Sequence, residues 1–299
     1  MNQLTITDKR IQKYNFGAPP AWPSVGLSLS VGGARGLAHV GVLQSLEEAG
    51  IQPIAISGAS MGGIIGALYA CGMSAGELRH FALSLAKPRE MLRLVDLLPG
   101  RRGLISSDKL RRLLCHEIGQ DTTFADLRVP LALSATDLAL GRQVKLTEGR
   151  VLPAVMATCA FPGVFPPVEI DGRQLVDGGV LNNLPVDMLA AFQPQLLIAV
   201  DVSPQVYEGS SYAHPPILNW MPGPAQILYQ STMLMNHALT DAHLEDQPPD
   251  LLIKPPIPGE IGVFDGFTRA KEIIDYGRGE TRNRLPQLLP KIGQYPGFE

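Results

Sequence analysis

The chain has 299 residues, of which 45% are hydrophobic and 18% charged, and its formal net charge is −3. This length and apolar share provide for a sizeable globular core, while the near-neutral charge excludes the basic surface expected of a nucleic-acid-binding protein. The three cysteines, Cys71, Cys115 and Cys159, lie far apart in apolar surroundings, which excludes a disulfide framework and favours reduced thiols.

The first 24 residues combine polar residues with several prolines and show no sustained hydrophobic period. They predict a loosely packed N-terminal arm, and residues 25–299 are predicted to form one domain with a core over 25–204 and a helical part over 225–299. The N-terminus lacks the basic-then-apolar order of a secretory signal. We therefore expect the protein in the cytoplasm.

A strand, a glycine-rich loop and a helix are predicted over residues 25–50. The loop Gly32–Gly36 reads G-G-A-R-G, and glycines allow the backbone to turn its N–H groups into an anion-binding nest. It contains neither G-x-G-x-x-G nor G-x-x-x-x-G-K-[ST], which argues against a nucleotide phosphate site. For Arg35 two roles stay open: it holds the turn by bonding carbonyls or a carboxylate, or it meets a lipid phosphate.

The next unit, I-A-I-S-G-A-S-M-G-G over residues 54–63, predicts a strand, a sharp turn and a helix. In a G-x-S-x-G turn the glycines, here Gly58 and Gly62, let strand and helix approach closely. Ser60 then lies at a helix N-terminus, where N–H groups can stabilise an oxyanion. A membrane span is the alternative, because residues 51–76 carry no charge, but their serines, glycines and Pro53 favour a buried strand and helix.

Residues 74–118 are predicted to be mostly helical, with Ser74 capping one helix and Ser106 or Ser107 capping another before Gly119. Between these helices, residues 91–105 interleave large apolar side chains with arginines. We favour a connector folded onto the core, because exposed apolar surface is the exception. The alternative is a lid in peripheral contact with anionic lipid at the inner face of the membrane.

Strands are predicted over 131–136 and 142–147, followed by a helical segment over 153–158 and a hairpin turning at Asp171-Gly172. The hairpin leads into Asp177-Gly178-Gly179, which taken alone is most often an ordinary turn. Asn182 or Asn183 is predicted to cap a helix, and the run L-L-I-A-V-D-V over 196–202 to close the sheet. The alternation of strands and helices predicts a parallel sheet. Residues 203–225 are predicted to be a proline-rich surface excursion, and beyond it helices are predicted, broken by a proline-rich stretch over 248–258.

The combination of G-G-A-R-G after the first strand, G-A-S-M-G after the second and D-G-G after the hairpin resembles the patatin-like phospholipases. The resemblance covers roughly residues 25–204. It implies a three-layer α/β fold, with a mostly parallel sheet between helices and a nucleophile elbow. The residue roles that it implies are Ser60 as nucleophile, Asp177 as base, Gly32 and Gly33 as oxyanion donors, and Arg35 as the arginine of the loop.

The chain departs from this family at Ser30 and Val31, which stand where the family's loop usually has glycine. The family uses a Ser–Asp dyad without histidine, whereas a triad in α/β-hydrolase order would need a histidine after Asp177. The histidines at 214, 237 and 243 satisfy that order, but we expect none of them to act. His39 is expected to pack or bond locally.

The resemblance implies a serine acyl-ester hydrolase of lipids, of the phospholipase A or lysophospholipase type, working through an acyl-Ser60 intermediate. Thioesterase and acyltransferase activities stay open. The rival hypothesis is a regulatory or protein-interaction module with the same fold and weak or no esterase activity. We expect no metal and no cofactor, since the six histidines show no H-E-x-x-H spacing. The expected partners are a lipid or acyl-ester substrate and no nucleic acid, and the sequence does not determine an oligomeric state.

Overall fold

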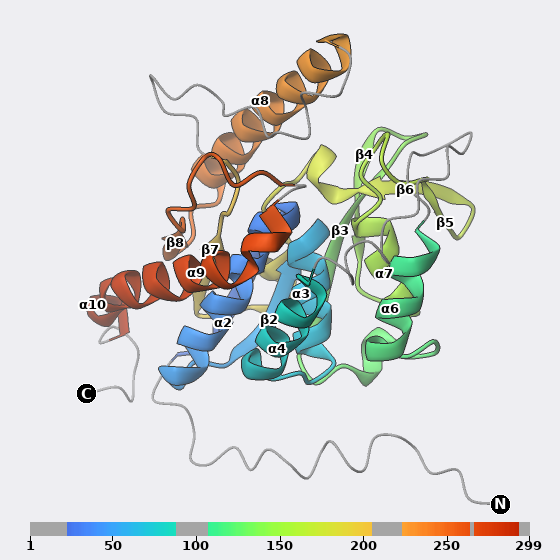
Figure 1. The fold of residues 1–299 in the computed structure, drawn as a ribbon. Coiled ribbons are helices and arrows are strands. Elements are labelled where there is room, and N and C mark those ends of the chain that lie inside the picture. The colour runs from blue at the N-terminus through green and yellow to red at the C-terminus, as the bar shows by residue number, and fades with distance from the viewer. Residues whose placement is uncertain (1–22, 88–106, 205–222, 264–265, 293–299) are drawn as a thin grey trace, which may run out of the picture.

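A computed structural model describes residues 23–87, 107–204, 223–263 and 266–292 (Figure 1). Its strands form one sheet in the order β5-β6-β3-β2-β1-β7-β8, with β4 paired to β3. The strands are β1 (Val25–Leu29), β2 (Pro53–Gly58), β3 (Leu131–Asp137), β4 (Arg142–Leu146), β5 (Val168–Ile170), β6 (Arg173–Asp177), β7 (Leu196–Val200) and β8 (Leu251–Ile253). The segment 91–105 and residues 1–22 of the predicted arm lie outside the described residues.

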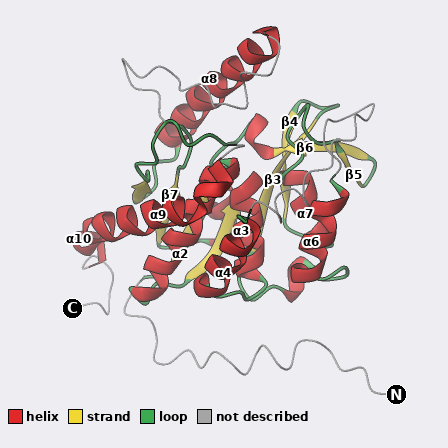
Figure 2. Ribbon diagram, in the orientation of Figure 1, coloured by secondary structure: helices red, strands yellow, loops and turns green. Residues whose placement is uncertain are grey.

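Helices alternate with these strands as the sequence predicts. The α-helices are α2 (Ala38–Glu48), α3 (Ser60–Ala70), α4 (Ala75–Leu85), α6 (Asp108–Ile118), α7 (Val151–Thr158), α8 (Gly223–Asp246), α9 (Ala270–Arg284) and α10 (Leu289–Ile292). The 3₁₀ helices that concern the site are η1 (Gly33–Leu37), η3 (Gly178–Val180) and η4 (Val186–Phe192). Figure 2 shows the helices gathered around the sheet. None of the helices in the described ranges is long and apolar enough to cross a membrane.

The centre of the sheet is parallel: β1 pairs with β2 and β7, β2 with β3, and β7 with β8. The pairs β3–β4, β3–β6 and β5–β6 are antiparallel. The residues of β1 and β3 are buried throughout, as expected of strands covered on both faces. The prediction of a mostly parallel α/β sheet is therefore confirmed.

Two layers cover the sheet. On one face α2 packs against α9 and α4, and α3 lies against β2 and β3 (Figure 1). On the other face η4 packs on β1 and β2, with Leu189 and Pro194 close to Gly26. A Cβ on Gly26 would lie 2.8 Å from Pro194 Cγ, so this glycine lets η4 approach the strand.

The turn predictions have mixed outcomes. Ser74 begins α4 with a capping box to Glu77, and Asp171-Gly172 forms the hairpin turn with φ of 50° and 73°, so both predictions are confirmed. Ser107 stands at the start of α6, but its side chain makes no capping hydrogen bond. Pro185, and neither asparagine, precedes η4. Asn182 donates instead to Asp187 Oδ1 at 2.6 Å, which removes its side chain from the cap.

The prediction that residues 196–202 close the sheet is wrong. The strand β8 adds to β7 in parallel, with Ile198 opposite Leu251 and Val200 opposite Ile253. This strand has only three residues and lies within the proline-rich stretch that the sequence predicts as a break between helices. Its pairing depends on β7, a long-range partner that a local pattern does not reveal.

A change of neighbour along β3 positions the candidate site. Leu133 pairs with Gly58 of β2, and two residues later Ala135 pairs with Asp177 of β6. Because β4 occupies the other side of β3 from Leu133 to Asp137, β2 and β6 share one side. The end of β6 therefore takes the place that β2 leaves when the chain turns at Ser60.

Candidate active site

The turn at Ser60 is tight. The strand β2 ends at Gly58 and α3 begins at Ser60, whose φ of 51° is unusual for a residue with a side chain. A Cβ on Gly58 would lie 2.8 Å from the carbonyl of Gly62, and one on Gly62 would lie 2.5 Å from the carbonyl oxygen of Ser30. The two glycines are thus required by backbone contacts. Ser60 itself is partly exposed at the start of the helix.

Thr158 and Cys159, at the end of α7, hold the backbone of Ser60. The N–H of Ser60 donates to Thr158 Oγ1 at 3.1 Å, and that hydroxyl donates to the carbonyl of Ser134 at 2.5 Å. The thiol of Cys159 donates to the carbonyl of Ser60 at 3.4 Å. The sequence does not assign either residue to the site, because its only signal at this position is the end of an apolar helix.

Asp177 lies at the end of β6 and is 1% exposed. Its Oδ1 accepts the N–H of Gly179 at 2.8 Å. Its Oδ2 is buried without a well-formed hydrogen bond among the described residues, although the Ser60 hydroxyl is close enough to lower the pKa of this carboxyl. Burial is the larger effect, and it raises the pKa of Asp177 to about 7. The site therefore pairs a partly exposed hydroxyl with a buried carboxyl that titrates near neutrality.

The loop that follows β1 forms η1. Gly33 has a φ of +50°, and a Cβ there would collide with the carbonyl oxygen of Val263, which also accepts the N–H of Ala34 at 2.8 Å. For Gly32, a Cβ would lie 2.5 Å from Val202 Cγ2. No hydrogen bond from the N–H of Gly32 or Gly33 is recorded within the described ranges. Both groups are thus candidates to bind an oxyanion.

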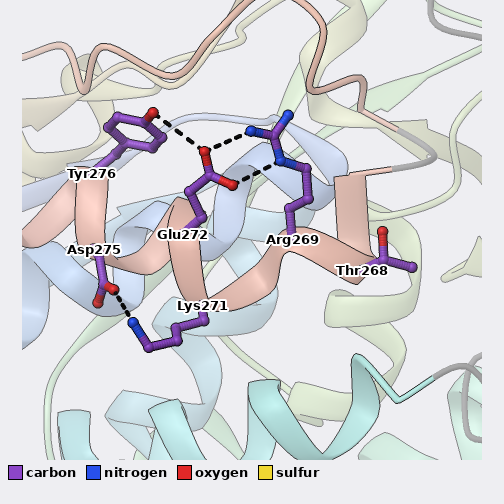
Figure 3. A pocket seen from close by; sticks show the side chains of 6 residues that line it. All are labelled: Thr268, Arg269, Lys271, Glu272, Asp275 and Tyr276. Carbon is purple, nitrogen blue, oxygen red and sulfur yellow. Dashed lines mark hydrogen bonds and ion pairs between the residues drawn. The ribbon is translucent and has the colours of Figure 1, made fainter.

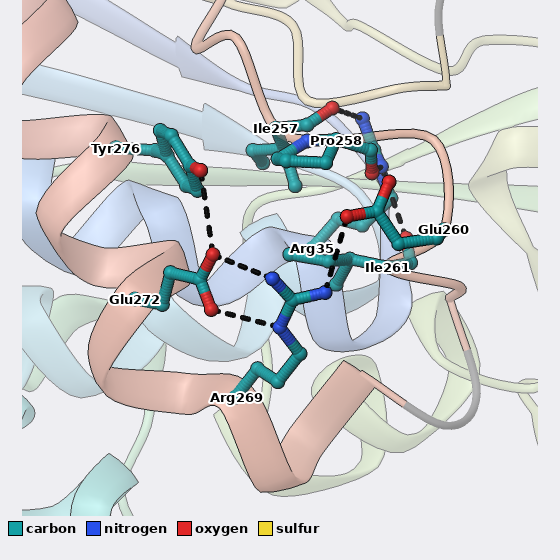
Figure 4. Close-up of polar contacts among 8 residues, drawn as sticks. All are labelled: Arg35, Ile257, Pro258, Glu260, Ile261, Arg269, Glu272 and Tyr276. Atoms are coloured by element: carbon teal, nitrogen blue, oxygen red, sulfur yellow. Dashed lines mark hydrogen bonds and ion pairs between the residues drawn. The ribbon is translucent and has the colours of Figure 1, made fainter.

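Arg35 is 2% exposed, and the structure decides between its two open roles. Its Nε donates to the carbonyl of Val202 at 2.9 Å, and its Nη1 donates to the carbonyls of Pro258 and Ile261 at 3.1 and 3.0 Å. Nη2 donates to the carbonyl of Ile257 at 3.2 Å (Figure 4). The guanidinium is thus buried against carbonyls and holds η1 to the segment 257–261, rather than meeting a phosphate.

The departure at Ser30 and Val31 has a structural explanation. The hydroxyl of Ser30 accepts the N–H of Val202 at 3.0 Å and donates to the carbonyl of Val31, which ties the end of β1 to the end of β7. Val31 packs against Gly179, where a Cβ would lie 2.7 Å from Val31 Cγ1. These two residues therefore hold the glycine loop and the turn after Asp177 together.

The described histidines that were considered for a triad lie next to residues other than Ser60 and Asp177. His39 Nε2 bonds the carbonyl of Ser30 at 2.9 Å, and burial lowers the pKa of this histidine to about 4, so its ring is neutral at pH 7. His237 Nε2 lies 3.6 Å from Asp241 within α8. His243 lines a cavity with Asn182 and Asp187. His214 lies outside the described residues.

One hollow on the described surface has a volume of about 540 Å³, and its lining includes neither Ser60 nor Asp177. It is lined by Thr268, Arg269, Lys271, Glu272, Asp275 and Tyr276 (Figure 3). Its charges are paired with one another, since Arg269 Nη2 lies 2.6 Å from Glu272 and Lys271 Nζ lies 2.9 Å from Asp275. We therefore do not assign it to an acyl chain.

Replacing Gly33 by alanine is expected to lower kcat by about 10²- to 10³-fold, the usual effect of losing one oxyanion donor. The methyl group would displace η1 from Val263 and turn the N–H away. Gly141→Ala is the matched control, because Gly141 has a similar φ of +58° with open space around it. Hydrolysis of a water-soluble ester measures both variants. A folded Gly33→Ala with full activity would assign the loop another role.

Comparison with known proteins finds a match of residues 27–190 to the family model described as patatin-like phospholipase. An uncharacterized NTE family protein of Mycobacterium bovis is 39% identical over 181 residues, covering 60% of this chain and 49% of the relative. The human patatin-like phospholipase domain-containing protein 6 is 34% identical over 186 residues, covering 61% of this chain and 14% of the relative.

A third relative, lysophospholipase nte1 of Aspergillus fumigatus, is 30% identical over 292 residues, covering 88% of this chain and 19% of the relative. The chain thus spans about half the length of the mycobacterial relative and less of the others. Among solved structures, VipD of Legionella pneumophila aligns with a TM-score of 0.47 at 14% identity, covering 89% of this chain and 68% of VipD.

Proposed function

Because this chain belongs to the patatin-like phospholipase family, we propose that it is a serine acyl-ester hydrolase of lipids, of the phospholipase A or lysophospholipase type. One observation carries the proposal: Ser60, at a strand-to-helix turn, lies beside the buried carboxyl of Asp177. The Aspergillus fumigatus relative is named a lysophospholipase, which supports the proposed substrate class.

In the first half of the proposed reaction, the carboxylate of Asp177 accepts the proton of the Ser60 hydroxyl as Oγ attacks the carbonyl carbon of the ester. The negative charge that forms on the carbonyl oxygen is stabilised by the N–H groups of Gly32 and Gly33. The tetrahedral intermediate collapses and the C–O bond to the alcohol breaks. Asp177 returns the proton to the departing alkoxide, which leaves an acyl ester on Ser60.

In the second half, a water molecule replaces the alcohol. Asp177 takes one proton from this water as its oxygen attacks the acyl carbon, and the same N–H groups stabilise the second oxyanion. The bond to Ser60 Oγ then breaks, the serine recovers its proton from Asp177, and the fatty acid leaves. One carboxyl thus serves as base and acid in both halves.

The environment of Asp177 suits this double role. A base whose pKa lies near the working pH accepts and returns a proton with little loss in either direction. An exposed aspartate, with a pKa near 3.9, would be a weak base for a hydroxyl. Burial raises the pKa of Asp177 to about 7, which brings it into the useful range.

The test of the proposal is covalent labelling by a fluorophosphonate, followed by peptide mapping. We expect the folded protein to be labelled at Ser60 and heat-unfolded protein not to be labelled, since the reaction needs the assembled site. Esters of rising acyl length would then define the substrate. Folded protein without label at Ser60 would favour the rival hypothesis of a regulatory or interaction module.

A further inference from the structure

The helix α8 is covered by little of the described protein. It makes no extended contact with any described helix or strand, and in Figure 1 it extends away from the sheet and the other helices. Nine large hydrophobic side chains are exposed in the described part of the chain, and five of them lie on α8. These are Ile227, Leu228, Leu234, Met235 and Leu239, which together we call the α8 apolar face.

The two sides of α8 are inverted relative to an ordinary surface helix. A series of less exposed positions recurs every three or four residues, at 226, 230, 233, 237, 240 and 244, and four of these six residues are polar: Gln226, Gln230, His237 and Thr240. The outward positions are apolar: Leu228 is 68% exposed and Met235 is 58% exposed. A helix on a water-exposed surface turns its apolar stripe inward and its polar side outward. The inversion therefore points to an apolar environment outside the described protein.

The α8 apolar face is broad. At 100° per residue, the exposed positions from 227 to 239 cover an arc of about 140°, and Ser231 is the one polar residue within it. A pair of helices in a coiled coil uses only a narrow seam, whereas an extended apolar phase contacts a wide arc. The breadth therefore favours a lipid surface over a second copy of this helix.

The carboxylates of α8 also lie at one end of the helix. Residues 223–240 contain no Asp, Glu, Lys or Arg, and the three carboxylates of the helix, Asp241, Glu245 and Asp246, lie at its C-terminal end. That end is the attached one, since Leu244 packs against the buried cluster of Leu184, Val186 and Ala199. The helix thus has a charged base on the body and an uncharged, apolar N-terminal part that projects from it.

The base of α8 is also connected to the candidate active site. Leu184 belongs to the cluster against which Leu244 packs. It follows Asn183, whose carbonyl accepts the N–H of Val31 at 3.0 Å. Val31 immediately precedes the glycine loop and packs against Gly179, two residues beyond Asp177. A surface that binds α8 would therefore lie at a fixed position relative to the candidate active site.

We propose that α8 is a bilayer-docking helix, whose apolar face inserts into the uncharged region of a lipid surface and anchors the protein on it. The inference rests on the proposed function, because a hydrolase of lipids must meet its substrate at such a surface. The contact is apolar rather than electrostatic, since the inserting part of the helix carries no charge. Binding is thus independent of anionic lipid.

The test is flotation of the full chain with vesicles of zwitterionic phosphatidylcholine. Leu228→Gln combined with Met235→Gln keeps the helix propensity and removes apolar surface from the α8 apolar face. We expect this double variant to lower the vesicle partition coefficient at least ~10-fold, from the usual free energy of burying large apolar side chains. Leu289→Gln is the matched control, because Leu289 is 59% exposed on α10, and it should bind as the wild type does.

Three results would overturn the proposal. They are wild-type protein that does not float with these vesicles, a double variant that floats equally well, and binding that needs anionic lipid and is abolished by salt. A dimer in light scattering that the double variant dissociates, without vesicle binding, would assign the face to a second copy.

Hydrolysis of a water-soluble short ester separates this proposal from the proposed function. We expect equal rates for the wild type, the double variant and Leu289→Gln, since none of the substituted residues lies in the site. Vesicle binding as expected, together with no hydrolysis of any ester by the wild type, would refute the activity and leave the docking helix standing.

Discussion

Ser60→Ala is expected to lower ester hydrolysis by at least ~10³-fold, because no other group at the turn can form the acyl intermediate. The fold should persist, since the backbone of Ser60 is held by Thr158 and Cys159 through main-chain atoms that alanine retains. Initial rates on a soluble ester and a thermal unfolding curve measure the two effects. Near-normal turnover by a cleanly purified variant would exclude a serine hydrolase.

The unusual backbone of Ser60 offers a matched variant. With a φ of 51°, any side chain at this position costs free energy that glycine avoids. Ser60→Gly should therefore be as inactive as Ser60→Ala but about 1 kcal/mol more stable. Equal stability of the two would mean that the turn relaxes when the hydroxyl is removed.

Asp177→Asn is expected to lower the rate by about 10³- to 10⁴-fold, the upper part of the range for loss of a general base. The amide is nearly isosteric and its oxygen can still accept the N–H of Gly179, so the geometry should persist while the proton acceptor is lost. No histidine replaces it in our proposal. A His39, His214, His237 or His243 to alanine variant that folds yet is as inactive as Ser60→Ala would replace the dyad by a triad.

The pH profile follows from the same carboxyl. Since the ionised form is the base and its pKa is about 7, kcat/KM should fall about tenfold for each pH unit below 7 and level off above it. A histidine acting as the base would give a similar fall in kcat/KM, with its midpoint near pH 6.5. Temperature distinguishes them, because carboxyl ionisation has a small enthalpy and imidazole ionisation a large one. An apparent pKa in this profile that shifts strongly with temperature would count against Asp177 as the base.

Asp177 should also make stability depend on pH. Between pH 4 and 7 the folded protein retains a proton that the unfolded chain has lost, so the contribution of this group to stability decreases as pH rises through that range. Asp177→Asn should therefore gain stability relative to the wild type from pH 4 to pH 8, by at most about 4 kcal/mol. Denaturant unfolding at the two pH values measures the difference. If the difference in stability between Asp177→Asn and the wild type were the same at pH 4 and pH 8, the carboxyl would not be buried as described.

Local patterns were sufficient for much of this protein. The order of strands and helices, the hairpin at Asp171-Gly172 and the capping box at Ser74 were predicted from periodicity and turn chemistry, because those features depend on neighbours within a few residues. The strand-turn-helix at Ser60 was predicted for the same reason: Gly58 and Gly62 are required by contacts within the turn and with the adjacent strand. The family resemblance then suggested Asp177 as the partner.

The tertiary structure decided what depends on distant residues. The strand β8 forms by pairing with β7. The role of Arg35 depends on the carbonyls of the segment 257–261. Thr158 reaches Ser60 only when α7 packs beside α3. The meeting of Asp177 with Ser60 arises because β6 pairs with β3 where β2 has turned away. Burial follows from that packing, and it raises the pKa of Asp177, because the free energy of a charge depends on everything that surrounds it.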